Sequence, residues 1–303
     1  MSSESVPADE PSTVAIVGAG AIGGVLADAV SRAGHEVVLC VRTPVPSLTV
    51  GRDGAEREVP ATVVADPAGL AGPVDWVLVT TKGHQTAGAF PWLRRLAGPG
   101  TPVVAVQNGV DHVRRLAGAS LPGPVLPALA WIWARREEPG RVAHAGGHRL
   151  IVPEVPVGRA FANLLAGGPI DVELSADFVT DAWRKLLTNV AASPITALTG
   201  RTMEVLHSPG IGSLVRGLLA EAVAAGNAAG AHLTDADVAA TLDWYQSLAG
   251  ARGTSMLEDR RAGRPTEHDD ITGAVVRAAD RHGVDVPLNR AVLALLTATS
   301  PAA

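Results

Sequence analysis

A glycine-rich turn near the N-terminus constrains the fold of this chain more than any other segment. Residues 13–17, Thr-Val-Ala-Ile-Val, are β-prone and run directly into Gly18-Ala-Gly20-Ala-Ile-Gly23. An apolar helical pattern continues to Ala33, Gly34 stands where a helix C-cap is expected, and residues 36–41 have the composition of a second strand. The order strand, G-x-G-x-x-G, helix, strand predicts a βαβ unit that binds a dinucleotide.

The three glycines of this turn each meet a physical requirement. Gly18 permits the tight turn, Gly20 lets the backbone approach a pyrophosphate, and Gly23 lets the helix pack on the strand. The N-terminus of the helix offers free N–H groups to phosphates. The alternative is a glycine-rich loop of an unrelated α/β protein, and the flanking strand and helix argue against it. The residues expected to bind the cofactor here are Gly18, Ala19, Gly20, Ala21, Ile22 and Gly23.

The end of the second predicted strand indicates which dinucleotide binds. An NAD site has an Asp or Glu at this point, which binds the ribose 2′-hydroxyl. Here the strand ends Leu-Cys-Val and Arg42 follows it. A guanidinium suits a 2′-phosphate by its charge and its forked geometry. We therefore expect NADP, with Arg42 at the 2′-phosphate; the alternative is that Arg42 is an ordinary solvated surface charge.

The bulk composition argues against several classes of protein. Of the 303 residues, 47% are hydrophobic and 18% are charged, which indicates a globular chain with one large domain or two of ordinary size. A formal net charge of −5 without a basic cluster argues against nucleic acid as a partner. Cys40 is the one cysteine of the sequence, so neither an internal disulfide nor a Cys-based zinc site is expected.

The sequence also shows no sign of a targeting or membrane segment. Residues 1–12 carry Glu4, Asp9 and Glu10 and lack the basic and apolar regions of a signal peptide, so we interpret them as a disordered tail. No apolar run reaches the roughly 18 residues that a membrane span needs. We expect no membrane partner and a cytoplasmic location.

Two further strands are predicted, and each ends at a polar side chain. Residues 74–81 end at Lys82, and residues 102–107 end at Asn108. In an open parallel sheet the ligand lies beyond the carboxyl ends of the strands, so both side chains are expected at the cofactor crevice. Further along, residues 129–135 and 141–145 flank Arg-Glu-Glu-Pro-Gly and predict a hairpin, which residues 148–152 continue.

Strand signals fade after about residue 177, and helical periodicity replaces them. Helices are predicted at residues 181–190, 203–229, 234–248, 255–261, 270–282 and 289–296, and Thr-Asp-Ala-Asp at 234–237 has the form of a helix start. The predicted fold class is α/β: a Rossmann-type doubly wound sheet domain followed by an all-helical C-terminal domain. We expect a tail at 1–12, an NADP-binding domain at 13–176 and a helical substrate and catalytic domain at 177–303.

Only two of the 25 basic residues are lysine, Lys82 and Lys185. A buried amine loses its proton near neutral pH, which a guanidinium does not, so a lysine can act as a proton donor inside a site. Lys185 and Asn189 are four residues apart, on one face of a predicted helix that Ser193-Pro194 interrupts. They are either a polar pair in a catalytic cleft or a surface lysine beside a surface amide.

Ser255 begins the sequence Ser-Met-Leu-Glu, which has the S-x-x-E form of a capping box. Ser255 is therefore expected to cap a helix, and the start of that helix also attracts carboxylates. The acidic segment Thr-Glu-His-Asp-Asp at 266–270 predicts the start of the next helix. His268 lies beside two carboxylates, but no second histidine stands at ligand spacing, so no metal is expected.

Together these motifs resemble the ketopantoate reductase (2-dehydropantoate 2-reductase) family over almost the whole chain after the tail. The segments that carry the resemblance are Gly18-Ala-Gly-Ala-Ile-Gly23, Val79-Thr-Thr-Lys82, Gln107-Asn-Gly109, the hairpin at 135–144, Lys185-Leu-Leu-Thr-Asn189, Pro194-Ile-Thr-Ala-Leu198, Ser255-Met-Leu-Glu-Asp259 and Gly263-Arg-Pro-Thr-Glu267. The resemblance implies an NADP-dependent oxidoreductase that reduces a 2-oxo acid to the 2-hydroxy acid in pantothenate biosynthesis. It places Lys82 on the cofactor side of the cleft.

The resemblance also implies roles for the other polar residues. Lys185 falls on the family's proton donor, Asn189 and Ser255 on substrate-binding positions, and Asn108 and Glu267 on positions at the nicotinamide, the ribose and the substrate. Hydride then adds to C2 of the oxo acid, while protonated Lys185 stabilises the charge on the carbonyl oxygen and delivers the proton. Glu267 either holds the Lys185 ammonium or binds the ribose.

Departures from the family pattern lie on the substrate side. The family usually has Asn where Ser193 stands and often has Asn where Arg252 stands, and its Ile-Asn-Gly is Ile271-Thr-Gly273 here. Ser193 and Arg252 are therefore expected at an altered substrate site, where Arg252 can pair with a second carboxylate. Trp131 and Trp133 are bulky and share one face of a strand. That face either packs in the core, which we favour, or reshapes the substrate pocket.

Three functions follow from these observations. The first is ketopantoate reduction, the second is reduction of a different 2-oxo acid or carbonyl in specialised metabolism, and the third is an NADP-binding sensor without catalysis. The intact Lys185, Asn189 and Glu267 argue against the third. The departures on the substrate side favour the second over the first. Apolar faces on the C-terminal helices permit a homodimer.

Overall fold

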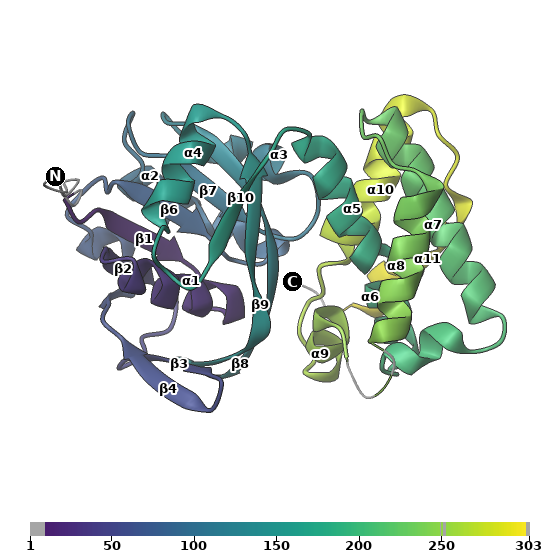
Figure 1. Cartoon of the computed structure of the whole chain (residues 1–303), viewed down its shortest axis with the longest axis horizontal. Helices are drawn as coiled ribbons and strands as arrows, with labels where there is room; N and C mark the ends of the chain where they lie inside the picture. Colours follow the sequence, from purple (N-terminus) through teal and green to yellow (C-terminus); the bar gives the residue numbers. More distant parts are fainter. Residues whose placement is uncertain (1–9, 249, 251–252, 301–303) are drawn as a thin grey trace, which may run out of the picture. The chain divides into compact units, whose positions relative to one another are not determined.

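The computed structural model describes residues 10–248, 250 and 253–300. It thus covers only residues 10–12 of the predicted tail, and Arg252 lies outside the described residues. The chain forms two compact units, whose elements are labelled in Figure 1. The first unit contains the chain up to Thr81 with Thr86–Gln107 and Leu116–Leu174; the second contains Lys82–Gln85, Asn108–Arg115 and the chain from Ser175 onward.

The first unit is built on a ten-stranded sheet in the order β4-β3-β9-β8-β7-β6-β1-β2-β5, with β10 paired to β9. The neighbours from β8 through β5 run parallel, whereas β8 and β9 form an antiparallel hairpin (Figure 1). The strands are β1 (Thr13–Val17), β2 (Glu36–Cys40), β3 (Leu48–Arg52), β4 (Ala55–Val59), β5 (Thr62–Val64), β6 (Trp76–Val79), β7 (Val103–Val106), β8 (Val125–Glu138), β9 (Arg141–Pro153) and β10 (Asp171–Ser175).

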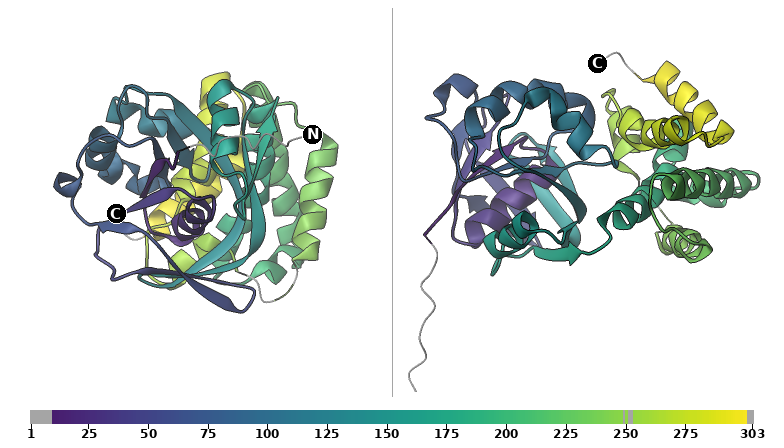
Figure 2. Two further views of the ribbon diagram at one scale, coloured as in Figure 1. Left: turned by 60° about the vertical axis from the view of Figure 1, so that its left-hand side comes forward. Right: turned by 90° about the horizontal axis from the view of Figure 1, so that it is seen from above.

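Helices cover both faces of this sheet, and alternate residues of strand β1 face the two opposite layers. Val14 and Ile16 pack in the layer that contains α1 (Ala21–Arg32) and α4 (Pro156–Leu164). Ala15 and Val17 pack in the other layer, with α2 (Thr86–Leu96). Figure 2 (left) shows α1 almost end-on, with β8 and β9 curving past it. The predicted Rossmann-type, doubly wound sheet is therefore confirmed.

The elements around the glycine turn lie where the sequence predicts them. β1, α1 and β2 agree with the predicted bounds within one residue, and Gly34 follows the helix with φ of 90°. β6 and β7 are shorter than predicted, whereas the arms of the β8–β9 hairpin are longer. The sequence does not predict the β3–β4 hairpin, because charged side chains interrupt its apolar pattern and it lacks the signal of a buried strand.

The second unit is predominantly helical and has its own hydrophobic core. Its helices include α5 (Phe178–Val190), α6 (Ala192–Thr199), α7 (Ile211–Ala228), α8 (Asp235–Ser247), α9 (Ser255–Arg261), α10 (His268–His282) and α11 (Pro287–Thr299). Trp183, Leu218, Tyr245 and Val275 are among the buried side chains of that core. The capping box predicted at the start of α8 is present. The predicted all-helical C-terminal part is confirmed.

One expectation about helix ends is wrong, and another is borne out. Residues 203–229 form a 3₁₀ turn, Met203–His207, and then α7, because Pro209 and Gly210 intervene and Gly210 adopts φ of 81°. The break predicted near Ser193-Pro194 is present, because α5 ends at Val190 and Ala191 separates it from α6. The α6 helix begins at Ala192, and Pro194 occupies its first turn, where a missing N–H leaves no intrahelical hydrogen bond unmade.

None of the helices in the described part of the chain is long and apolar enough to cross a membrane. Within the same residues, no three His, Cys, Asp or Glu side chains gather in an arrangement that would hold a metal ion.

Candidate active site

The glycine turn is shaped by close backbone contacts within the first unit. Gly18 adopts φ of 114°, which side chains rarely allow, and its N–H donates to the Cys40 carbonyl at 3.1 Å. A Cβ at Gly23 would collide with the Gly18 carbonyl oxygen, which also accepts a hydrogen bond from the Thr80 hydroxyl at 2.6 Å. The fold of the turn itself thus requires glycine at positions 18 and 23.

Gly20 differs from these two glycines, because no atom of the described residues beyond its own chain neighbours lies within 4 Å of the position that its Cβ would take. Gly20 is the N-cap of α1, and no side chain caps this helix. The first N–H groups of α1 are therefore available to a ligand, at the positive end of the helix dipole. This open backbone surface fits a pyrophosphate.

Arg42 is exposed and lies two residues after the end of β2. No acidic side chain that the structure describes forms an ion pair with it. The positive charge of its guanidinium is therefore not neutralised within the first unit, as a 2′-phosphate site requires.

Lys82 forms an ion pair with Asp259 of α9, and both residues belong to the second unit. Asp259 is almost completely buried, and Arg264 donates to its other carboxylate oxygen at 3.0 Å. One buried carboxylate thus binds two cations and fixes the position of the Lys82 ammonium. Asp259 belongs to the motif that begins at Ser255, but the motif alone does not indicate which side chain it pairs with.

Asn108 and Glu267 are brought together although one follows a strand and the other begins a helix. The Asn108 carboxamide donates a hydrogen bond to the Glu267 carboxylate at 3.0 Å. Glu267 is 6% exposed and is the N-cap of α10, as the acidic segment predicted. The carboxylate therefore has a defined orientation, and its second oxygen remains available as an acceptor.

Lys185 and Asn189 lie one turn apart on α5, so their side chains share a face of the helix. Both are half-buried. Burial lowers the pKa of the Lys185 amine from its ordinary value of 10.5 to about 8. An amine with this pKa is mostly protonated at neutral pH and can release its proton readily, which suits a general acid.

The predicted cap at Ser255 is wrong. Thr254 is the N-cap of α9, and its hydroxyl accepts a hydrogen bond from the Leu257 N–H at 3.2 Å. Ser255 is the first residue of the helix and is exposed, so its hydroxyl is not needed for capping. A hydrogen bond of 2.7 Å between the Thr196 and Thr254 hydroxyls joins α6 to the start of α9. Ser193, also on α6, is 3% exposed.

Two family models match this chain. The ketopantoate reductase PanE/ApbA model matches residues 14–156, and the ketopantoate reductase PanE/ApbA C-terminal model matches residues 177–300. This chain belongs to the ketopantoate reductase family. The predicted resemblance is therefore confirmed.

Relatives with curated names cover almost the full length. A 2-dehydropantoate 2-reductase from Caulobacter vibrioides is 38% identical over 289 residues, which cover 95% of this chain and 99% of that protein. The 2-dehydropantoate 2-reductase from Mycobacterium tuberculosis strain H37Rv is also 38% identical, over 95% of this chain and 97% of its own length. The structure of a dimeric ketopantoate reductase from Staphylococcus aureus has 26% identity and a TM-score of 0.86, over 95% of this chain and 98% of that chain.

The structure corrects one expectation about departures from the ketopantoate reductase pattern. Ile132 of β8 packs in the core, so Trp131 and Trp133 face away from it, contrary to the favoured interpretation. Trp133 is 41% exposed, and the guanidinium of Arg149 lies over the Trp131 ring at 5.4 Å. Thr272 is completely buried, and its hydroxyl has no hydrogen-bond partner among the residues that the structure describes.

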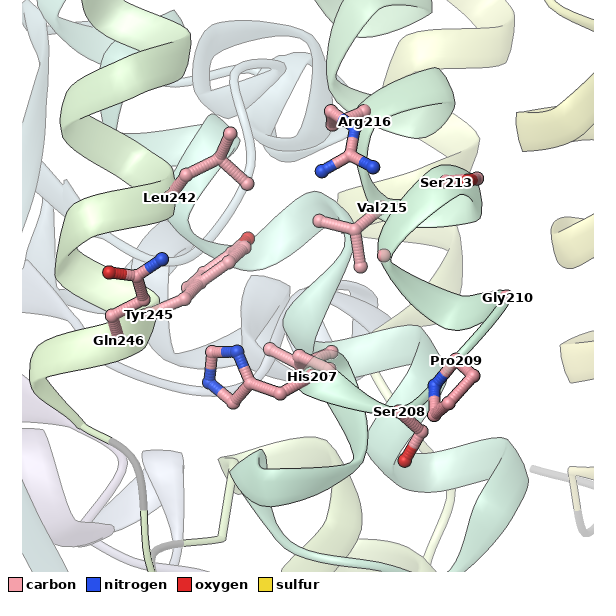
Figure 3. Close-up of a pocket in the computed structure, with 12 residues that line it drawn as sticks. His207, Ser208, Pro209, Gly210, Ser213, Val215, Arg216, Leu242, Tyr245 and Gln246 are labelled. Atoms are coloured by element: carbon pink, nitrogen blue, oxygen red, sulfur yellow. The ribbon is translucent and has the colours of Figure 1, made fainter.

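A pocket of about 360 Å³ lies within the second unit, between the turn Met203–His207, the start of α7, and α8. Figure 3 shows His207 and Arg216 among its lining side chains. None of the lining residues is a predicted site residue, and none belongs to the motifs that carry the family resemblance. The pocket therefore does not form part of the candidate active site.

Proposed function

We propose that this protein is an NADPH-dependent 2-dehydropantoate 2-reductase, which converts ketopantoate to pantoate. Membership of the ketopantoate reductase family and the names of the 38% identical relatives support the reaction. The observation that carries the proposal is the Lys185 amine, whose pKa burial lowers to about 8, one turn from the Asn189 carboxamide.

The residues of the first unit fit NADP. The N–H groups that follow Gly20 would bind the pyrophosphate, and Arg42 would bind the 2′-phosphate. When bound, NADPH supplies a hydride from C4 of its nicotinamide. Lys82, Asn108 and Glu267 are proposed to bind the nicotinamide end of the cofactor. We propose residues 13–176 as the cofactor-binding domain and residues 177–303 as the substrate and catalytic domain.

Lys185 acts as the general acid in this mechanism. Its ammonium donates a hydrogen bond to the carbonyl oxygen of the 2-oxo acid and transfers the proton as negative charge develops there. Asn189 can donate to the same oxygen from the same face of α5, which fixes the direction of the proton transfer. The exposed hydroxyl of Ser255 would bind the substrate carboxylate, with Ser193 on the neighbouring helix.

Steady-state oxidation of NADPH with ketopantoate tests this function. We expect saturable turnover with a Michaelis constant in the micromolar to sub-millimolar range and with NADPH strongly preferred to NADH. Tight NADPH binding without turnover on any 2-oxo acid would instead leave a non-catalytic sensor.

The second candidate is reduction of a different 2-oxo acid. Ser193 favours it, because a buried hydroxyl there is shorter than the asparagine that the family usually has. A panel of 2-oxo acids that differ at C3 and C4 separates the two candidates. A kcat/KM for another acid at least about 10-fold above that for ketopantoate would establish the second function.

We further propose that the protein forms a homodimer through α11. Leu288 and Leu295 are seven residues apart on one face of this helix, with 37% and 56% of their surfaces exposed. The relative from Staphylococcus aureus is described as dimeric. Sedimentation should give a dimer mass for the wild type and a monomer mass for Leu295→Arg. A monomeric wild type would contradict the proposal.

A further inference from the structure

Arg115 connects two parts of the candidate site within the second unit. This residue lies on α3 (His112–Leu116), and its side chain is 8% exposed. One terminal nitrogen, Nη1, donates to the Asp270 carboxylate at 2.9 Å, and Nη2 donates to the main-chain carbonyl of Asn108 at 2.6 Å. The guanidinium therefore links the first turn of α10 to the main chain of Asn108, whose side chain hydrogen-bonds Glu267.

Asp270 lies directly against the backbone of both strand-end segments. A Cβ at Gly83 would collide with the Asp270 carboxylate. At Gly109, where φ is 90°, a Cβ would collide with the Asp270 carbonyl oxygen. Asp270 itself is 7% exposed. The first turn of α10 thus contacts the segment after β6 through the Asp270 carboxylate and the segment after β7 through the Asp270 main-chain carbonyl.

We infer that Arg115 and Asp270 are positioning residues for the reduction proposed above: they hold Asn108 in the orientation that its carboxamide needs at the nicotinamide and substrate. This inference rests on the proposed function. Arg115 would act through the main chain of Asn108, and Asp270 would act through Arg115. We call the three residues the Asn108 clamp.

The cost of burying two charges supports a positioning role over a purely stabilising one. Removing an arginine and an aspartate from water is costly, and apolar residues of similar size often give equal or greater stability. The arrangement also requires a forked donor. A guanidinium satisfies two acceptors in fixed directions, whereas the ammonium of lysine is a single point charge on a flexible chain.

Arg114, next to Arg115 on α3, provides a matched control. Its side chain is 54% exposed and pairs with Asp111 at 3.1 Å. It makes no contact in the Asn108 clamp, so Arg114→Lys should leave both turnover and NADPH affinity unchanged.

The test compares Arg115→Lys, Asp270→Asn, Asn108→Ala and the double variant Arg115→Lys/Asn108→Ala. We expect kcat/KM for ketopantoate to fall about 10- to 100-fold in each single variant, because misplacement by about 1 Å costs this much in an oriented site. The double variant should be no more than about twofold worse than Asn108→Ala, because both changes remove the same interaction. Thermal midpoints measured in parallel report any loss of folding.

Wild-type kcat/KM in a folded Arg115→Lys enzyme would overturn the inference, and so would losses that multiply in the double variant. If Arg115→Lys does not fold, the same comparison is made with Asp270→Asn and the double variant Asp270→Asn/Asn108→Ala. Wild-type kcat/KM in Asp270→Asn, or losses that multiply in this double variant, would then overturn the inference. If the wild type does not turn over ketopantoate, the proposed function fails, and the NADPH dissociation constant then tests the clamp. It should rise about 10-fold in Arg115→Lys and stay unchanged in Arg114→Lys; an unchanged value in both would overturn the clamp.

Discussion

The Asn108 carboxamide donates a hydrogen bond to the Glu267 carboxylate at 3.0 Å, although 159 residues separate the two in the chain. Asn108 follows strand β7, and Glu267 is the N-cap of α10. The pair is buried enough that each group limits the orientations of the other. Asn108 and Glu267, which are both expected to lie at the nicotinamide and ribose of the cofactor, thus form one hydrogen-bonded pair.

Replacing Glu267 by alanine should impair both cofactor binding and turnover. The change removes an acceptor and leaves the Asn108 amide without its partner, which costs about 1–3 kcal/mol. We expect the KM for NADPH to rise about 10-fold and kcat to fall, as measured by steady-state kinetics. Glu258→Ala, at an exposed position of α9, is the control. Unchanged constants in Glu267→Ala would remove Glu267 from the site.

The pH dependence of turnover should report the Lys185 amine. Its pKa is lowered to about 8, and the reduction needs the protonated form, so kcat should be constant below pH 7 and fall about tenfold per pH unit well above pH 8. Lys185→Ala should lower kcat by ~10² or more. A wild-type profile without a limb near pH 8, or near-normal turnover of the variant, would exclude Lys185 as the proton donor.

The two lysines should respond differently to arginine. Lys185→Arg should abolish most turnover, since a guanidinium does not readily release a proton. Lys82→Arg should mainly weaken NADPH binding, because Lys82 supplies a charge that Asp259 holds in place. Fluorescence titration of NADPH together with kcat separates the two outcomes. Normal behaviour of both variants would show that neither position requires an amine.

The sequence best predicts those structural elements whose formation depends on residues close together in the chain. The β1–α1–β2 unit carries its signal in one continuous stretch, in which apolar periodicity, glycine spacing and a C-cap agree. The failures at Thr254 and Ser255 arise because adjacent residues can each cap a helix, and the backbone conformation decides between them. The alternation of a strand shows that Trp131 and Trp133 share a face, but not which face is covered.

Contacts between distant segments leave no local signal. Nothing in the residues near Lys82 indicates Asp259, and nothing near Asn108 indicates Arg115 or Asp270 as partners. These partners are set by the tertiary fold, which groups Lys82–Gln85 and Asn108–Arg115 with the helical unit. The family motifs identify which positions matter, whereas the fold identifies what holds them.

Arg42→Ala should weaken NADPH binding much more than NADH binding. The exposed guanidinium has no acidic partner among the described residues, so its loss removes a charge that only the 2′-phosphate would use. We expect the dissociation constant for NADPH to rise at least about 10-fold, with NADH changed less than about twofold. Arg52→Ala, on β3 and paired with Asp53, is the control. Equal losses for both cofactors would remove Arg42 from the 2′-phosphate site.

Asp270 should make the free energy of unfolding depend on pH in the direction opposite to that of an ordinary paired carboxylate. Burial raises the pKa of its carboxyl from 3.8 to about 6, although Arg115 opposes the shift. The folded state therefore keeps this proton to a higher pH than the unfolded state, and ionisation costs stability between pH 4 and 6. Relative to Asp270→Asn, the wild type should lose about 3 kcal/mol of unfolding free energy from pH 3.5 to 7. Urea unfolding of both proteins across that range measures the difference, in which the other titrating groups cancel; a difference that does not change with pH would contradict the raised pKa.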